Sequence, residues 1–402
     1  MTRTVQPCRL SALGMVSALG TGPAETWPRL IAGDTSRLVR RADLVPEQEL
    51  IIGMCAEPLP PVPEGLREFD CRNNRLLLAA LDQIVQPIVG AIARYGRARV
   101  AVVAGTSTAG VADAEEAIRH QVRTGNLPER FRYAQLEFGG TSDFIAAYLG
   151  TTGPAYTLST ACSSGARALA SARSLLAMGM ADAVVCGAAD TLCGVTANGF
   201  SSLGVVAPEL TNPCSANRRG LTLGEAAAFF LVTREEGGVQ LSGVGESSEA
   251  HHMSSPDPEG SGARAAMQAA LADAGVSAAD IAYLNLHGTG TSINDAMESR
   301  AVSEVLGPSV PVSSTKSLVG HTLGAAGAIE AAFCWQVLDA FDGGELALPP
   351  HRWDGVPDPD LPALDLVEPG RRVAAGKVAR VMTNSFGFGG NNCTLILERR
   401  VA

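Results

Sequence analysis

Short apolar runs alternate with helical patterns along this chain, and no other feature of the sequence limits the possible folds as strongly. Mostly apolar runs, typical of strands buried on both faces, occupy 99–104, 181–186, 227–232 and 281–286. Helical periodicity is found at 75–93, 163–178, 263–274 and 325–338. Strands that alternate with helices predict an α/β protein whose sheets are covered by helices.

The alternation runs through the chain twice. Paired glutamates and glycines at 235–238 indicate a surface turn between the two passes. We therefore predict an N-terminal half at 1–237 and a C-terminal half at 238–402. A polar stretch rich in Ser, Pro and Gly at 247–262 predicts a loop, which either borders a substrate entrance or is a plain surface connection.

Charge and cysteine content exclude several classes of function. The formal net charge of -10 opposes general attraction to nucleic acid or to an anionic membrane. Nine cysteines without C-x-x-C spacing argue for a reducing compartment, against a disulfide framework and against a metal site. We also expect no segment long and apolar enough to span a bilayer. These features predict a cytoplasmic protein without nucleic-acid partner, membrane insertion or bound metal.

The apolar stretch 10–19, which follows Arg3 and Arg9, has some likeness to a signal peptide. Small and polar residues interrupt it, and no small-x-small cleavage site follows. We interpret this stretch as the first strand and its turn.

Cys162 lies where three local signals meet. The run 153–159 is typical of a strand, the segment 160–165 (TACSSG) turns sharply, and an alanine-rich helix continues to 178. Unpaired N–H groups and the dipole at a helix N-terminus lower a thiol pKa, so we predict a nucleophile whose thiolate is available at neutral pH. The alternative, an inert core cysteine, is our interpretation of Cys186, Cys193, Cys334 and Cys393.

Two histidines lie in turns beside glycines. His287 follows a buried strand and opens 287–291 (HGTGT), where two threonine hydroxyls could bind an amide-bearing ligand arm. His321 ends 314–321 (STKSLVGH), ahead of a helix of very small residues. By itself Lys316, inside that segment, would be interpreted as a solvated surface charge. The other histidines are interpreted as structural or surface residues: His120, His251, His252 and His351.

Two further segments carry candidate residues. Asp295 and Glu298 begin a helix, where carboxylates suit the dipole, and helix capping is a sufficient role for Asp295. The segment 384–392 (NSFGFGGNN) joins two strand-like runs, and its glycines allow a backbone N–H to approach a reacting carbonyl.

The segments TACSSG, HGTGT, STKSLVGHTLGAAG and NSFGFGGNN, in this order and spacing, resemble the thiolase-fold β-ketoacyl synthases across nearly the whole chain. The histidine pair resembles the elongating branch, which has a Cys-His-His triad. Initiating synthases carry Cys-His-Asn, and thiolases carry a second, late cysteine, for which Cys393 is the only candidate. The resemblance implies two pseudo-duplicated halves in a five-layer α-β-α-β-α fold.

The resemblance also implies a reaction. Cys162 would take an acyl group from an acyl carrier protein, and malonyl carrier protein would then lose CO₂ and attack the thioester. His287 and His321 would stabilise the enolate, while the N–H groups of Cys162 and Phe388 would form the oxyanion hole. No cofactor would be bound, since the substrates arrive on the phosphopantetheine arm of the carrier protein.

Supporting roles also follow from the resemblance. Lys316 would support the histidine network, Glu298 would be the carboxylate behind it, and Phe388 would be the gating aromatic. Substrate and phosphopantetheine binding is assigned to Thr289, Thr291, Phe386 and Gly389.

Some positions depart from the family pattern. Elongating synthases usually carry Pro-Phe-Asp before Arg-Asp-Gly, whereas this chain has PCS at 213–215 and RRG at 218–220. The glycine-rich turn after the central strand is GTSTAG at 105–110. The triad is intact, but the shape of the acyl pocket and the preferred chain length stay open.

The stretch 72–81 (RNNRLLLAAL), together with the Gly-Thr-Ser turn, is similar to the synthases of bacterial aryl polyene pathways. Those enzymes condense an aryl starter with malonyl units and resemble proteins that pair with an inactive, chain-length-controlling homologue. The resemblance thus implies either a homodimer or a heterodimer with such a chain-length factor. Fatty-acid elongation is the alternative pathway. A non-catalytic partner subunit is the alternative class, and it would lack the nucleophile.

A group of arginines occupies one segment of this acidic chain, near His120. Because acyl carrier proteins are acidic, the group is either a docking surface for the carrier or a solvated helix and loop. Its members are Arg119, Arg123, Arg130 and Arg132.

Overall fold

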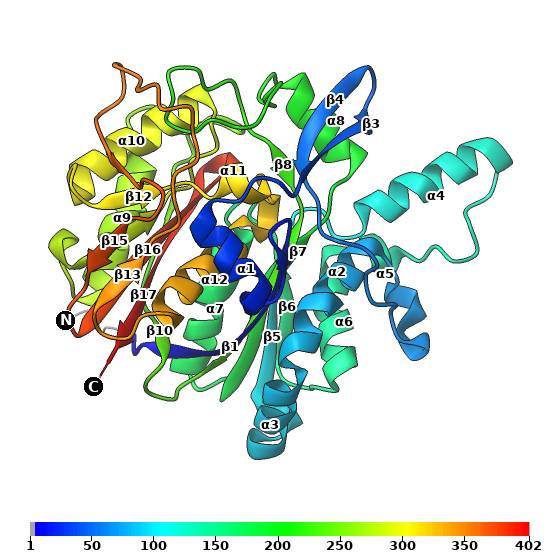
Figure 1. Ribbon diagram of the computed structural model, residues 1–402. Helices are drawn as coiled ribbons and strands as arrows, with labels where there is room; N and C mark the ends of the chain where they lie inside the picture. Colours follow the sequence, from blue (N-terminus) through cyan, green and yellow to red (C-terminus); the bar gives the residue numbers. More distant parts are fainter. Residues whose placement is uncertain (1–4, 402) are drawn as a thin grey trace.

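The computed structural model describes residues 5–401, in which two similar sets of five strands form one continuous sheet system (Figure 1). The strand order in the N-terminal half is β6 (Ala155–Leu158), β5 (Val100–Gly105), β7 (Ala183–Asp190), β9 (Ala226–Thr233) and β1 (Cys8–Ser17). The C-terminal half has the order β12 (Pro311–Ser313), β11 (Tyr283–Asn285), β16 (Val378–Gly387), β17 (Asn391–Arg400) and β10 (Val239–Ser248).

The two sets share one pattern of strand directions. The first three strands of each set are parallel, and the last two are antiparallel to their neighbours. A short pairing of β1 with β10, at Cys8↔Leu241 and Arg9↔Gln240, joins the sets. The turn at 234–238 connects β9 to β10.

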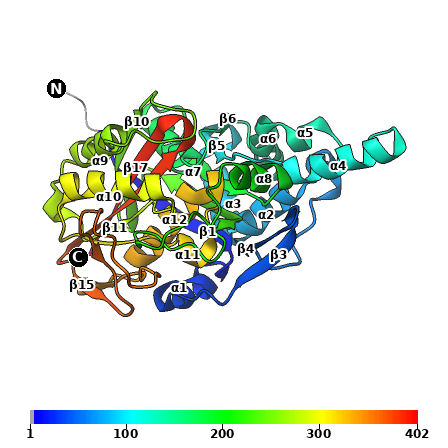
Figure 2. The same ribbon diagram turned by 90° about the horizontal axis from the view of Figure 1, so that it is seen from above.

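Helices complete the layers on both sides of each sheet (Figures 1 and 2). Between the two sheets lie α7 (Ser164–Ala177) and α12 (Ala326–Asp339), whose apolar side chains form the largest core cluster. The outer face of the N-terminal sheet is covered by α2 (Arg72–Leu81), α3 (Val85–Tyr95) and α6 (Phe138–Leu149), and that of the C-terminal sheet by α9 (Ser261–Ala274) and α10 (Ser292–Leu306). The expected α-β-α-β-α layering is confirmed.

Two glycines allow the central helices to cross at close range. A Cβ atom on Gly165 of α7 would lie 2.6 Å from the backbone nitrogen of Ala328, and one on Gly327 of α12 would lie 2.6 Å from that of Ala166. Any side chain at either position would therefore push the helices apart.

One expectation about the helices is wrong. The helical run Arg72–Tyr95 is long and apolar enough to cross a membrane by length and composition, although none was expected. Its buried leucines and isoleucines, such as Leu77 and Ile88, pack against the N-terminal sheet, as they do in the core helices of globular proteins. The stretch with a likeness to a signal peptide lies mostly in β1, while Arg3 is outside the described residues.

Candidate active site

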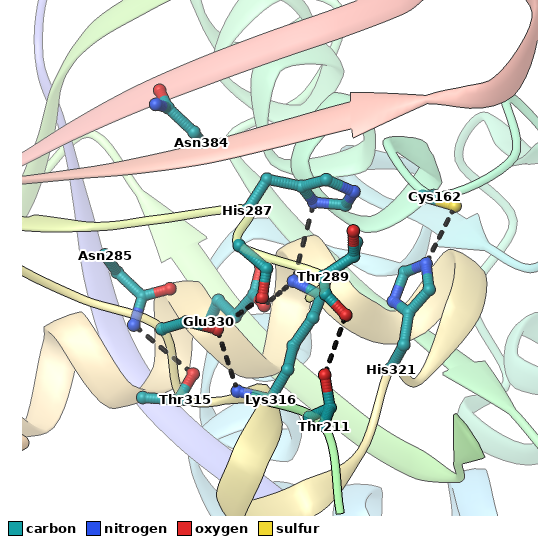
Figure 3. A network of polar contacts seen from close by, with 12 residues as sticks. Cys162, Thr211, Asn285, His287, Thr289, Thr315, Lys316, His321, Glu330 and Asn384 are labelled. Carbon is teal, nitrogen blue, oxygen red and sulfur yellow. Dashed lines mark hydrogen bonds and ion pairs between the residues drawn. The ribbon is translucent and has the colours of Figure 1, made fainter. Parts of the chain in front are cut away.

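Cys162 is held at the junction between β6 and α7. The residue before it, Ala161, has a φ of 52°, in the left-handed region that residues with a Cβ rarely adopt. Its carbonyl accepts hydrogen bonds from the Ser164 amide at 3.1 Å and the Ser164 hydroxyl at 2.6 Å. The tight turn directs the Cys162 side chain toward the segments that follow β11 and β12 (Figure 3).

The Cys162 thiol contacts one histidine directly. His321 Nε2 lies 3.0 Å from Sγ, and the Phe388 backbone N–H donates to the same sulfur. Burial raises the pKa of Cys162 to about 11, although Lys316 and the Phe388 amide act in the opposite direction. The expectation of a lowered thiol pKa is therefore wrong for the resting site, because loss of solvation outweighs the Lys316 charge and the Phe388 amide.

His287 lies beside His321, with the ring centroids 5.4 Å apart and the planes at 87°. Lys316 Nζ is 3.5 Å from His287 Nδ1 (Figure 3). Burial, followed by the charge of Lys316, lowers the pKa of both histidines well below its usual value, so both are neutral at pH 7. Since Lys316 donates to Nδ1 of His287, the hydrogen of that neutral ring is on Nε2.

Lys316 is a buried charge and not the surface charge that an isolated lysine suggests. It begins α11 (Lys316–Val319), and its Nζ lies 2.5 Å from the Glu330 carboxylate on α12. Both side chains are at most 2% exposed. Burial raises the pKa of Glu330 to about 7 against the effect of Lys316. Our reading of the sequence missed Glu330, whose only signal is a carboxylate in a helix of small, apolar residues.

Two carboxylates of α10 hold the loop that carries His287. Glu298 accepts the backbone N–H groups of His287 and Gly288 at 2.8 and 2.6 Å. Asp295 accepts those of Gly290 at 3.1 Å and Cys214 at 2.9 Å. Helix capping is thus the wrong role for Asp295, which instead joins two loops far apart in the sequence. Burial raises the pKa of Glu298 to about 7.

A cavity of about 300 Å³ opens in front of the thiol. Its wall includes both histidines, the expected gating aromatic Phe388 and, among the residues assigned to substrate, Thr289, Thr291 and Phe386. Gly389 does not line it, and its N–H donates to the Met253 carbonyl at 2.8 Å. The polar loop contributes Ser254, Ser255 and Pro256 to the wall, so this loop borders the cavity.

The same three side chains form a donor set that a cation could use. Cys162 Sγ and one ring nitrogen of each histidine lie within 4.8 Å of one another, and thiolate with imidazole is a set that suits Zn²⁺. The hydrogen that Lys316 keeps on His287 Nε2 opposes ligation by that nitrogen. The arrangement therefore suits nucleophilic and hydrogen-bonding chemistry better than metal binding.

The arginine group lies away from this cavity and divides into two pairs. Arg119 and Arg123 lie on α4 (Val111–Thr124), which projects from the body (Figure 2), and form ion pairs with Glu115 and Glu116. Arg130 and Arg132 have no carboxylate within ion-pair distance among residues 5–401. The second pair lines a charged hollow together with Arg67 and Arg75.

Comparison with known proteins gives matches along most of the chain. Residues 72–237 match the family model "Beta-ketoacyl synthase, N-terminal domain" and residues 239–340 match "Beta-ketoacyl synthase, C-terminal domain". Nodulation protein E of Rhizobium meliloti is 33% identical over 313 residues, covering 75% of this chain and 76% of that protein. The 3-oxoacyl-acyl-carrier-protein synthase 2 of Vibrio cholerae is 29% identical over 427 residues, covering 97% and 98%.

Solved structures agree with these relatives. A chain from the complex of the ketosynthase ApeO with its chain length factor ApeC, from Xenorhabdus doucetiae, is 44% identical with a TM-score of 0.92 and covers 99% of this chain and 98% of that chain. A β-ketoacyl synthase from Burkholderia phymatum is 28% identical with a TM-score of 0.84, covering 99% and 100%.

The buried ion pair generates a stability prediction. We expect Lys316→Met to lower the free energy of unfolding by about 3–5 kcal/mol, because Glu330 would be left buried without its partner. The double variant Lys316→Met/Glu330→Gln should lose clearly less free energy of unfolding than the single variant. Urea unfolding at pH 8 measures both, and Arg372→Met/Glu345→Gln, which removes an exposed pair, is the control. A double variant no more stable than the single one would contradict the prediction.

Proposed function

We propose a reaction for this chain, which belongs to the β-ketoacyl synthase family. It extends an acyl group bound to Cys162 by decarboxylative condensation with the malonyl group of a malonyl acyl carrier protein. As a member of that family the chain is a condensing acyltransferase. The observation that carries the residue roles is the 3.0 Å contact between Cys162 Sγ and His321 Nε2, with His287 beside it.

Acyl transfer begins at a neutral thiol. Cys162 gives its proton to His321 Nε2 as Sγ attacks the thioester carbonyl of the acyl carrier protein, and the new oxyanion accepts the N–H groups of Cys162 and Phe388. The Phe388 N–H already points at the sulfur in the resting site. Collapse of the tetrahedral intermediate breaks the carbon–sulfur bond of the carrier arm. The thiolate of that arm then takes the proton from His321.

Condensation uses the histidines as neutral hydrogen-bond donors. His287 donates from Nε2 because Lys316 occupies Nδ1. His321 Nδ1 has no partner among the described residues, so its tautomer is not fixed and Nε2 can donate once the thiol is acylated. Malonyl loses CO₂, and the electron pair of the broken bond forms an enolate that these donors stabilise. The enolate carbon attacks the acyl carbonyl, and Cys162 leaves as a thiolate that takes up one proton.

The pathway we propose is aryl polyene synthesis. The support is the stretch 72–81 with the turn at 105–107, together with the 44% identity to a chain of the ApeO–ApeC complex over nearly the full length. Over a comparable share of the chain, 97%, identity to the V. cholerae synthase is lower, at 29%, which makes ordinary fatty-acid elongation the second candidate. All nine cysteines are unpaired. Because free cysteines are typical of a reducing compartment, we also propose a cytoplasmic location.

We also propose a heterodimer with a homologous chain-length factor, as in the ApeO–ApeC complex. Strand β6 lies at one end of the main sheet, and the only described strand that pairs with it is β5. The carbonyls of Pro154 and Leu158 accept hydrogen bonds from the β5 side. Strand alternation therefore directs the polar backbone groups of Thr157 outward, where a partner strand could pair with them.

The Cys162 role is tested by intact-mass spectrometry. Wild type incubated with aryl-polyenoyl or fatty acyl carrier protein should gain one acyl mass, and added malonyl carrier protein should discharge it as β-ketoacyl product. Cys162→Ala should gain none, whereas Cys193→Ala should behave like wild type. A wild type that stays unacylated with every donor would refute the nucleophile assignment, and preferential loading of saturated fatty acyl groups would favour elongation.

The partner proposal is tested by native mass spectrometry after co-expression with a homologous subunit that lacks the nucleophile. We expect a one-to-one complex, and Thr157→Pro should abolish it because proline removes an outward N–H from the edge strand. Circular dichroism checks that this variant stays folded. A folded Thr157→Pro chain that still binds its partner would show that β6 is not the interface.

Carrier docking is assigned to Arg130 and Arg132, since local glutamates already offset Arg119 and Arg123. The variant Arg130→Glu/Arg132→Glu should raise the KM for acyl carrier protein about tenfold, equivalent to about 1.4 kcal/mol, and leave the KM for a small acyl thioester unchanged. Arg119→Gln/Arg123→Gln should change either KM less. An equal response of carrier-bound and small substrates would rule out docking at this pair.

A further inference from the structure

Asp190 is a buried carboxylate for which the proposed mechanism has no use. It ends β7 and is fully buried. No lysine, arginine or histidine lies within ion-pair distance of it among residues 5–401. A buried charge without a cation persists only where hydrogen-bond donors replace water around it.

Six donor groups surround this carboxylate. Five come from the turn after β5, and the sixth is the backbone N–H of Gly324 at 2.6 Å. The five are Thr106 Oγ1 at 2.6 Å, Ser107 N at 2.9 Å, Ser107 Oγ at 2.6 Å, Thr108 N at 2.9 Å and Thr108 Oγ1 at 2.7 Å. Every one of these distances lies in the range of good hydrogen bonds.

The sixth donor connects Asp190 to the other half of the protein. Gly324 lies three residues after His321, in the turn η5 (Leu323–Ala325), where Leu323 has a φ of 53°. The Gly324 N–H also reaches Ser107 Oγ at 3.1 Å. A Cβ on Gly324 would lie 2.6 Å from Asp190 Oδ2, so the backbone itself presses against the carboxylate.

We propose that Asp190 is a positioning residue of the condensing site, which anchors the His321 segment of the C-terminal half to the N-terminal half that carries Cys162. The inference rests on the roles proposed above for Cys162 and His321. The Ser107 hydroxyl completes the anchor, because it donates to Asp190 and accepts from Gly324. Thr108 donates to the same carboxylate and, within residues 5–401, makes no hydrogen bond to Gly324.

The charge of Asp190 also acts on the thiol. Charged and titratable groups around Cys162 come from several elements: Lys316 of α11, Glu330 of α12, His287, His321 and Asp190. Lys316 lowers the thiol pKa, whereas Asp190 and Glu330 raise it. Removal of the Asp190 charge should therefore favour the thiolate and shift alkylation of Cys162 to lower pH.

The experiment compares Asp190→Asn, Ser107→Ala and Thr108→Val with wild type. Asp190→Asn should lower kcat about 10²-fold, the cost of a small misplacement of a catalytic group, and leave the KM for malonyl carrier protein unchanged. Its rate of Cys162 alkylation by iodoacetamide, followed by mass spectrometry, should show the shifted pH profile. Ser107→Ala should lower kcat more than Thr108→Val, and both should keep the wild-type alkylation profile.

Two results would overturn the proposal. One is an Asp190→Asn protein with wild-type kcat, and the other is an equal effect of Ser107→Ala and Thr108→Val. If Asp190→Asn does not fold, the comparison of kcat between Ser107→Ala and Thr108→Val still tests the proposal. Failure of the proposed function is seen separately, because wild type would then not be acylated at Cys162. Asp182→Asn, at the other end of β7 and paired with arginines at the surface, is the matched control.

Discussion

The close crossing of α7 and α12 is the constraint on which the rest of this site depends. Cys162 precedes α7, and His321 precedes α12 by one short turn. Gly165 and Gly327 bring the two helix backbones together where any Cβ would meet backbone atoms of the other helix. Because both helices are packed between two sheets, the contact between thiol and imidazole is set by the rigid core.

The same packing removes water from the site and so decides its chemistry. Desolvation raises the pKa of Cys162 and lowers the pKa of both histidines, which makes the resting triad neutral. Neutral imidazoles can donate or accept hydrogen bonds as each half-reaction requires, while Lys316 sets the tautomer of His287. Buried carboxylates then hold backbone segments: Glu298 holds the His287 loop, and Asp190 holds the turn after His321.

Local patterns, together with the family resemblance, were sufficient for the three reactive side chains that border the cavity. Cys162 and His287 were each predicted from a strand followed by a tight turn, His321 was predicted from its glycine-flanked turn together with the family resemblance, and the structure brings all three together. Glu330 and the role of Asp190 were missed because their partners are distant in the chain. Lys316 is 14 residues from Glu330, and Gly324 is 134 residues from Asp190. Neither separation leaves a periodic signal.

The sequence by itself determined the α/β architecture and the two passes of strands and helices, because these depend on short-range periodicity and turn chemistry. It also determined the nucleophile and the histidine donors, whose roles follow from the resemblance of their motifs to the β-ketoacyl synthases. Only the tertiary structure decided the protonation of the thiol, the burial of Lys316 and the role of Asp295. The Asp295 carboxylate joins two loops by accepting the backbone N–H groups of Gly290 and Cys214. These properties depend on which distant groups displace water from one another, and local sequence carries no record of that exclusion.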